Sequence, residues 1–203
     1  ASAVFIGSEA VVFGGFDLDG GSERLLADGM IYQPPPRDAA ANSLAAGSFS
    51  SCAFTKDGVL ECWGWIFPTA ADPDVNLRRP YAIKGISAEE GYQLSLGAAH
   101  GCAVVASPGP VRCWGNNIFG ALGSPDKSVQ GPIVVPLPRP ALQVAAGENH
   151  ACAILDNRQA WCWGLNNFGQ LGNGATSQKT PPVQVVGLSL VAQISGGGDH
   201  SCA

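Results

Sequence analysis

Short apolar runs recur along the chain at an interval of fifty residues, and residues typical of tight turns separate them. In each copy two short runs flank a turn, which is Lys56-Asp57-Gly58 in one copy and Asp156-Asn157 in another. The second run of each pair ends in Cys-Trp-Gly. Two short runs joined by a tight turn predict a β-hairpin. A later apolar run in each copy, such as the one that begins at Pro182-Val183, predicts an outer strand.

The same interval relates single residues, and it divides the chain into units. Cysteine, glycine, histidine and apolar positions all repeat in this frame: Cys52, Cys102, Cys152 and Cys202; Gly47, Gly97, Gly147 and Gly197; His100, His150 and His200; Leu44, Leu94, Val144 and Ile194. We therefore predict a single segment made of a degenerate unit without cysteines, three full units and the start of another, at residues 1–43, 44–90, 91–140, 141–190 and 191–203.

A unit of four short strands cannot bury both faces of its own small sheet, so neighbouring units must stack. Radial stacking gives a β-propeller, whereas a β-solenoid generally has shorter coils and lacks a closed hairpin with Trp-Gly ends. The 27 glycines and 15 prolines also leave little room for long helices. The sequence predicts an all-β fold of propeller blades, each of four short antiparallel strands, forming a partial ring.

Two stretches of the third unit resemble the repeats of the regulator of chromosome condensation family: Ala-Gly-Glu-Asn-His-Ala-Cys-Ala at 146–153 and Cys-Trp-Gly-Leu-Asn-Asn-Phe-Gly-Gln-Leu-Gly at 162–172. The family's Gly-x-x-His and Asn-x-x-Gly-x-Leu-Gly elements also occur at 97–100 and 117–123. The unit from Gly47 departs from this pattern, with Ser50 in place of histidine and Trp65-Ile66-Phe67-Pro68 in place of the second element. Residues 4–34 look more like a kelch repeat, which is another propeller blade.

The resemblance implies a β-propeller, usually of seven blades, that serves as a rigid platform for protein recognition. Members of the family act on chromatin-linked GTPases, inhibit β-lactamases or sense light, so the resemblance carries no site residue to this chain. Seven units would need about 350 residues. We therefore expect this chain to be part of a longer array.

Each full unit holds two cysteines on opposite sides of its hairpin turn. Because the hairpin places them opposite one another, we predict three disulfides: Cys52–Cys62, Cys102–Cys113 and Cys152–Cys162. Buried free thiols are the alternative. However, each full unit contains both cysteines and the N-terminal unit contains neither, so the cysteines occur as pairs. Cys202 is left over, with a partner expected about ten residues beyond Ala203. Disulfides favour a secreted protein, either extracellular or at the cell surface.

The histidines lie two residues before a cysteine, on the same face of a strand, which raises zinc binding as an alternative. Ser50 replaces histidine in a unit that keeps both cysteines, so we expect hydrogen bonds between blades and no metal. Asp17-x-Asp19-Gly20 with Glu23 lacks the further ligands of a calcium loop and predicts an acidic turn. Because every histidine occupies a repeated position, we predict no catalytic residue, no cofactor and no enzyme activity.

The charge and the hydropathy of the chain exclude two classes of partner. The net charge is −5, and the densest basic pair is Arg78-Arg79, so nucleic acid is disfavoured. No apolar run approaches the length of about 18 residues that a membrane span requires. The tryptophans of Cys-Trp-Gly recur once per unit, which predicts packing between blades rather than sugar stacking, whereas Trp161 lies outside the pattern and is freer to be exposed.

We therefore expect an extracellular binding or scaffold module that recognises a protein or a surface glycan through propeller loops. An enzyme with its active site in the propeller channel or on further blades is one alternative. A self-associating structural subunit of a fibre or surface layer is another.

The strongest break in the repeat covers residues 65–81, and it is the predicted partner site. Scaffold residues recur for packing, whereas a site that faces a partner has no reason to recur. Aromatic residues and arginine are the usual anchors of interfaces, which selects Trp65, Phe67, Arg78, Arg79 and Tyr81. For Trp65 and Phe67 the alternative is that their side chains only fill the space left by the missing motif. We expect this segment to project as a loop from one face of the propeller.

Overall fold

The structure is a computed structural model, and it describes residues 2–6, 9–13, 30–32, 44–55, 57–65, 76–87, 92–126 and 132–203. Every helix or strand assigned in this part of the chain is a β-strand, which confirms the all-β prediction. The predicted acidic turn at Asp17-x-Asp19-Gly20 lies outside the described residues.

Three four-stranded antiparallel sheets form the centre of the molecule, and in each of them consecutive strands are neighbours. The first contains β4 (Leu44–Ala46), β5 (Ser50–Phe54), β6 (Val59–Trp65) and β7 (Asn76–Ser87). The second contains β8 (Gln93–Leu96), β9 (His100–Val104), β10 (Val111–Gly115) and β11 (Ile133–Val134). The third contains β12 (Ala141–Ala146), β13 (His150–Leu155), β14 (Ala160–Asn166) and β15 (Ser177–Gln184).

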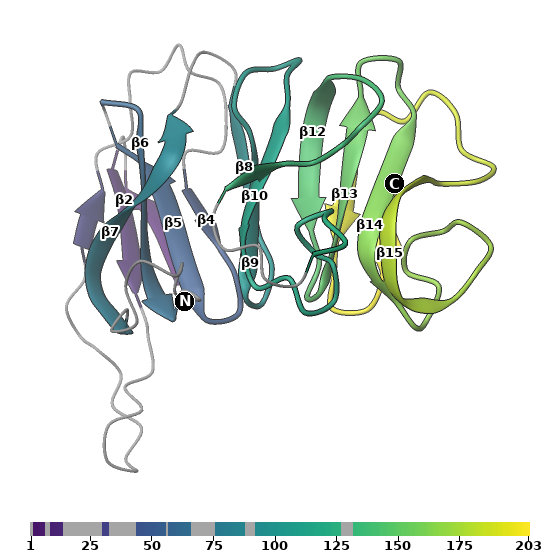
Figure 1. Ribbon diagram of the computed structural model, residues 1–203. Helices are drawn as coiled ribbons and strands as arrows, with labels where there is room; N and C mark the ends of the chain where they lie inside the picture. Colours follow the sequence, from purple (N-terminus) through teal and green to yellow (C-terminus); the bar gives the residue numbers. More distant parts are fainter. Residues whose placement is uncertain are drawn as a thin grey trace.

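Smaller sheets lie at the two ends of the chain. The N-terminal sheet contains β1 (Ser2–Ile6), β2 (Glu9–Phe13) and β3 (Met30–Tyr32). The C-terminal sheet contains β16 (Ser195–Gly196) and β17 (Ser201–Cys202). Figure 1 shows the three four-stranded sheets standing side by side in chain order.

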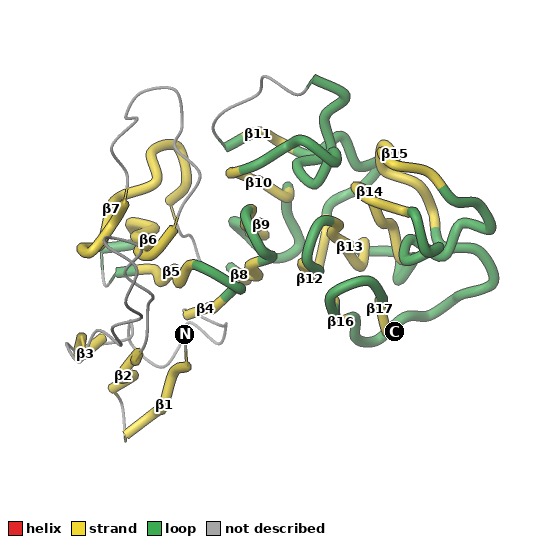
Figure 2. The backbone as a smooth tube through the Cα atoms, turned by 90° about the horizontal axis from the view of Figure 1, so that it is seen from below, coloured by secondary structure: helices red, strands yellow, loops and turns green. Residues whose placement is uncertain are grey.

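The sheets radiate from a common side, as the blades of a propeller do. In Figure 2 the first strands β4, β8, β12 and β16 follow one another along the inside of an arc, and β7, β11 and β15 lie outside. Neighbouring first strands contact each other, β4 with β8 and β8 with β12. The predicted propeller blades of four antiparallel strands are thereby confirmed.

Each blade contains the predicted hairpin and its disulfide. Cys52 lies directly opposite Cys62 in the β5–β6 register, and the same holds for the pairs in β9–β10 and β13–β14. All three predicted disulfides are present, Cys52–Cys62, Cys102–Cys113 and Cys152–Cys162. Their sulfur atoms lie inside the molecule, since all six cysteines are buried.

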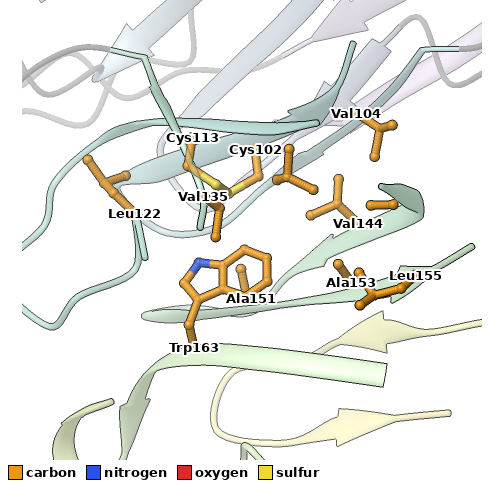
Figure 3. Packing of buried hydrophobic residues seen from close by; sticks show 12 residues of the cluster. Cys102, Val104, Cys113, Leu122, Val135, Val144, Ala151, Ala153, Leu155 and Trp163 are labelled. Carbon is orange, nitrogen blue, oxygen red and sulfur yellow. A yellow bond between two sulfur atoms is a disulfide. The ribbon is translucent and has the colours of Figure 1, made fainter. Parts of the chain in front are cut away.

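The hydrophobic core lies between the blades. One cluster joins Cys102, Val104 and Cys113 of the second blade to Ala151 and Trp163 of the third (Figure 3). Trp163 is completely buried there, and its indole Nε1 donates a hydrogen bond to the carbonyl oxygen of Ala121, 2.9 Å away in the preceding blade. The prediction that Cys-Trp-Gly tryptophans pack between blades is confirmed for this residue.

The glycine of Cys-Trp-Gly is required by its backbone conformation. Gly115 and Gly164 have φ values of 103° and 104°, a region that residues with a side chain rarely adopt. A Cβ on Gly164 would also lie 2.7 Å from the carbonyl oxygen of Asn149. The third strand of each blade can therefore pass close to the turn that precedes the second.

Candidate binding face

Two loops that leave the third strands of neighbouring blades form the candidate site. They cover residues 116–126 after β10 and 167–176 after β14, and we call them together the loop face. Because β10 and β14 occupy the same place in their blades, both loops lie at the same end of the propeller.

One buried asparagine organises each loop. The Oδ1 of Asn117 accepts a hydrogen bond from the backbone N–H of Leu122 at 3.0 Å, and its Nδ2 donates to the carbonyl oxygens of Ser124 and Asp126 at 3.1 and 2.6 Å. An amide side chain has both a donor and an acceptor, so it can satisfy loop backbone groups of either kind. This explains why the family element begins with asparagine.

Asn166 repeats the arrangement in the next blade. Its Oδ1 accepts from the backbone N–H of Leu171 at 3.0 Å, and its Nδ2 donates to the carbonyl oxygen of Ala175 at 2.9 Å and to Asn173 Oδ1 at 3.0 Å. Leu171, like Leu122 in the other loop, is fully buried. The loops are therefore held by internal hydrogen bonds and by apolar anchors, which makes them rigid.

The rigid loops carry large apolar side chains at the surface. Phe119 and Phe168 occupy equivalent positions two residues after the organising asparagine, and they are 39% and 72% exposed. Ile118, next to the first of them, is 53% exposed. Exposed aromatic residues on a preorganised surface are suited to contact with another protein.

These residues lie within the repeated motif, and repetition is typical of packing residues, so the sequence pattern does not select them. The motif's asparagine and leucine do face inward, but the two residues that directly follow the asparagine face solvent. One signal was present in the sequence. Phe119 and Phe168 are large apolar residues at a position that the element Asn-x-x-Gly-x-Leu-Gly leaves unspecified.

The predicted site residues that the structure describes lie in strands, whereas the break in the repeat predicted a projecting loop. Arg78 and Arg79 belong to strand β7, so the expectation that they lie in a projecting loop is wrong. Tyr81 is also on β7, where it lies opposite Cys62 of β6. Its half-buried side chain packs against the core cluster of the first blade. Trp65 ends β6 opposite Asn76, and Phe67 lies outside the described residues. Residues 76–81 therefore belong to β7 rather than to a loop, residues 66–75 lie outside the described residues, and contact with a partner there stays a prediction.

The repeated histidines lie between blades. His150 is buried, and its Nε2 lies 2.8 Å from the hydroxyl oxygen of Ser201 in the C-terminal sheet. His100 is buried too, but its Nε2 has no hydrogen-bond partner. Burial lowers the pKa of both imidazoles, that of His100 to about 4, with a smaller contribution from the nearby His150. The prediction of histidine hydrogen bonds between blades is confirmed for His150.

The sequence also raised a metal site, an exposed Trp161 and a membrane span. No group of three metal-ligating side chains occurs among the described residues. Trp161, expected to be freer, is only half exposed and packs against the core cluster of Trp163. The described residues also include no helix long and apolar enough to cross a membrane.

At the opposite end of the third blade, an ion pair braces the hairpin turn. Arg139 Nε lies 2.5 Å from Asp156 Oδ1, and a second guanidinium nitrogen lies 3.0 Å from Oδ2. The guanidinium lowers the pKa of the Asp156 carboxyl through these hydrogen bonds. Both groups are at the surface, so this pair orients the turn and adds little stability.

Comparison with known proteins identifies the repeats. Models of the Regulator of chromosome condensation (RCC1) repeat match residues 109–154 and 159–203, and a related model with the same description matches residues 142–170. A stretch of 115 residues is 33% identical to the E3 ubiquitin-protein ligase HERC2 of Homo sapiens and covers 54% of this chain and 2% of that protein. A stretch of 116 residues is 28% identical to Regulator of chromosome condensation of Drosophila melanogaster and covers 55% and 21%.

Solved structures share the fold. Prp20p from Saccharomyces cerevisiae is 25% identical with a TM-score of 0.60, and the match covers 76% of this chain and 39% of Prp20p. Human WBSCR16 is 19% identical with a TM-score of 0.73, and the match covers 96% and 52%. The chain thus spans about half, or less, of the length of the proteins it matches.

Proposed function

Because the chain belongs to the regulator of chromosome condensation repeat family, a family of β-propellers, we propose that it is a binding module that holds another protein against its loop face. The observation that carries the proposal is the exposure of Ile118, Phe119 and Phe168 on loops fixed by buried asparagines. Exposing three large apolar side chains on rigid loops adds nothing to the internal packing. It does supply preformed anchors for a partner.

Proteins of the same family support the class of partner. Prp20p has been characterised for its binding to Gsp1p and histones, and a crystal structure shows Kap60 bound to yeast RCC1. These are protein partners, and we propose a protein partner here as well. Trp63, Trp114, Trp161 and Trp163 are all at least partly buried, so a surface glycan, which would stack on an exposed tryptophan, has less support.

We further propose that the module acts by binding and has no catalytic role of its own. The buried histidines support this, since both lie between blades in repeated positions and the site of a single reaction would have no reason to repeat. We also propose an extracellular or cell-surface location, supported by the three disulfides. Alkylation of the protein from its own compartment, carried out in denaturant without reductant, should leave these six cysteines unmodified, and modification of all six would exclude that location.

The test of the binding proposal begins with capture of the partner. A photoreactive phenylalanine analogue at position 119 cross-links whatever contacts the loop face, and the cross-linked protein is then purified for affinity measurements. The variant Ile118→Asp/Phe119→Asp/Phe168→Asp should bind it at least about tenfold more weakly, since each buried apolar anchor contributes on the order of 1 kcal/mol or more.

Matched controls separate the loop face from other surfaces. Val134 is 50% exposed at the end of β11, away from the loop face, so Val134→Asp should leave the affinity unchanged. Arg78→Ala/Arg79→Ala/Tyr81→Ala tests the surface predicted from the repeat break. If the triple loop-face variant binds the partner as well as the wild type does, the proposal is wrong.

A further inference from the structure

The loop that follows β14 contains the dipeptide Asn173-Gly174, which is the only asparagine–glycine pair in the chain. Such a pair is chemically labile, because the backbone nitrogen of the second residue can attack the side-chain amide carbon of the first. Glycine has no side chain to hinder this attack. The pair belongs to the loop face and lies five residues after Phe168.

The attacking nitrogen is accessible in the folded chain. Gly174 is exposed, and a Cβ added to it would meet no atom within 4 Å. Its backbone N–H donates no hydrogen bond to any residue that the structure describes. The nitrogen is therefore neither covered nor engaged by the described part of the chain.

The Asn173 side chain is held by its oxygen alone. Its Oδ1 accepts a hydrogen bond from Asn166 Nδ2 at 3.0 Å and another from the backbone N–H of Ala175 at 3.1 Å. Its Nδ2 has no hydrogen-bond partner among the described residues. Donors on the amide oxygen stabilise the negative charge that this atom acquires when the amide carbon is attacked. The amine that must leave is not retained by any hydrogen bond to these residues.

The equivalent loop of the preceding blade lacks the reactive pair. Ser124-Pro125 stands in its place, and Ser124 Oγ accepts the backbone N–H two residues further on at 3.2 Å, as Asn173 Oδ1 does. Proline has no backbone N–H, so its nitrogen cannot attack. Pro125 is exposed although Lys179 of the third blade contacts its carbonyl oxygen, so a blade packed beside this position does not cover it. The exposure of Gly174 therefore belongs to the loop itself.

We propose that Asn173 is a site of deamidation, and that this reaction acts as a slow, irreversible switch on the loop 167–176. The Gly174 nitrogen loses its proton and bonds to Asn173 Cγ. The bond between Cγ and Nδ2 breaks, and Nδ2 takes up a proton and leaves as ammonia. Water then opens the succinimide ring. Cleavage between Cγ and the Gly174 nitrogen gives aspartate, and cleavage on the other side of that nitrogen gives isoaspartate.

The two products affect the loop differently. In aspartate, a carboxylate oxygen replaces Oδ1 and accepts the same two hydrogen bonds, which the negative charge strengthens. In isoaspartate, Cγ becomes part of the main chain, which is longer by one methylene group. The oxygen that Asn166 Nδ2 contacts moves with the main chain, so this buried amide loses one of its two acceptors. An unpaired buried donor is costly, and the loop loosens.

The effect on a partner rests on the proposed function. Both products add one negative charge to the loop that carries Phe168. The isoaspartate form also loses the rigidity that makes this side chain a preformed anchor, so it should hold the partner more weakly.

The experiment incubates the full 203-residue chain and a synthetic peptide of residues 170–177 at neutral and at mildly alkaline pH. Peptide mapping by mass spectrometry detects the replacement of the amide by a carboxyl group, and isoaspartyl methyltransferase labels the isoaspartate product. We expect conversion at position 173 in the folded chain, faster at the higher pH because the attacking nitrogen must lose its proton. Asn167 is also exposed but precedes Phe168, and as the internal control it should stay unchanged.

Two variants test the effect on the loop. Asn173→Ser copies the neighbouring loop and should abolish the conversion. Asn173→Asp reproduces the aspartate product and should leave the amide of Leu171, which donates to Asn166 Oδ1, as protected from hydrogen exchange as in the wild type. In the isoaspartate form this protection should fall at least about tenfold.

Two results would overturn the proposal. Conversion of the peptide without conversion of the folded chain would show that the native loop withholds Gly174 from the reaction. Unchanged protection of Leu171 in the isoaspartate form would show that the reaction does not act on the loop. Neither measurement involves a partner, so both results leave the proposed function to its own test.

Discussion

Acid should loosen the contact between the second and third blades through His100. This imidazole is 5% exposed, its pKa is lowered to about 4 chiefly by burial, and its Nε2 has no hydrogen-bond partner. In the unfolded chain its pKa returns to about 6.5. Between these two values the unfolded state binds a proton that the folded state does not, so the stability falls as the pH falls from about 6.5 to 4.

The size of the loss follows from the difference between the two pKa values. At roughly 1.4 kcal/mol per pKa unit, the full difference corresponds to about 3 kcal/mol, of which about 2 to 3 kcal/mol is lost by pH 4.5. At pH above about 7 the group is neutral in both states and has no effect on the pH dependence.

The assay is guanidinium unfolding followed by tryptophan fluorescence at pH values from about 7.5 to 4.5, for the wild type and for His100→Gln. Since His150 is present in both proteins, its own contribution cancels in the comparison. The wild type should lose about 2 to 3 kcal/mol more than the variant across this range. Parallel stability curves for the two proteins would refute the reasoning.

A companion variant tests the unpaired nitrogen. Ala151 occupies the position at which Ser201 meets His150 in the next repeat, so Ala151→Ser should give His100 Nε2 a partner. At neutral pH we expect a gain of about 1 kcal/mol, and no gain in a His100→Gln background. An equal gain in stability in both backgrounds would show that the gain does not come from a hydrogen bond to His100.

Three further outcomes are expected. Asn166→Ala should lower the free energy of unfolding by about 2 to 4 kcal/mol, because it leaves buried loop groups unpaired, whereas the exposed Asn167→Ala should change it little in the same denaturation assay. Trp163→Phe keeps most of the packing but removes the hydrogen bond to Ala121, and calorimetry should show a loss of about 1 to 3 kcal/mol. Arg139→Ala should leave the melting temperature almost unchanged in physiological salt, since its ion pair is exposed.

The blades and their disulfides could be predicted from the sequence because they depend on residues close in the chain. A hairpin of about ten residues brings its own cysteines into register, whatever lies around it. The fifty-residue period then required neighbouring units to stack, since each unit carried apolar residues that one small sheet cannot bury. For the same reason the burial of Trp163 between blades followed from its place in the repeat.

The location of the candidate sites depended on contacts that the period does not encode. Whether Arg78 lies in a loop or a strand was decided by how far β7 pairs with β6. That pairing joins residues on either side of the break in the repeat. The solvent exposure of Phe119 was decided by the Asn117 hydrogen bonds, which hold the loop so that the two residues after the asparagine face outward.

The sequence by itself determined the repeating unit, its hairpins and the partners of six cysteines. Only the tertiary structure decided that the loops of neighbouring blades share one face and that His100 lacks the partner His150 has. The physical reason is that hairpin formation is local, whereas exposure and hydrogen-bond satisfaction are properties of surfaces that meet only when one blade packs against the next.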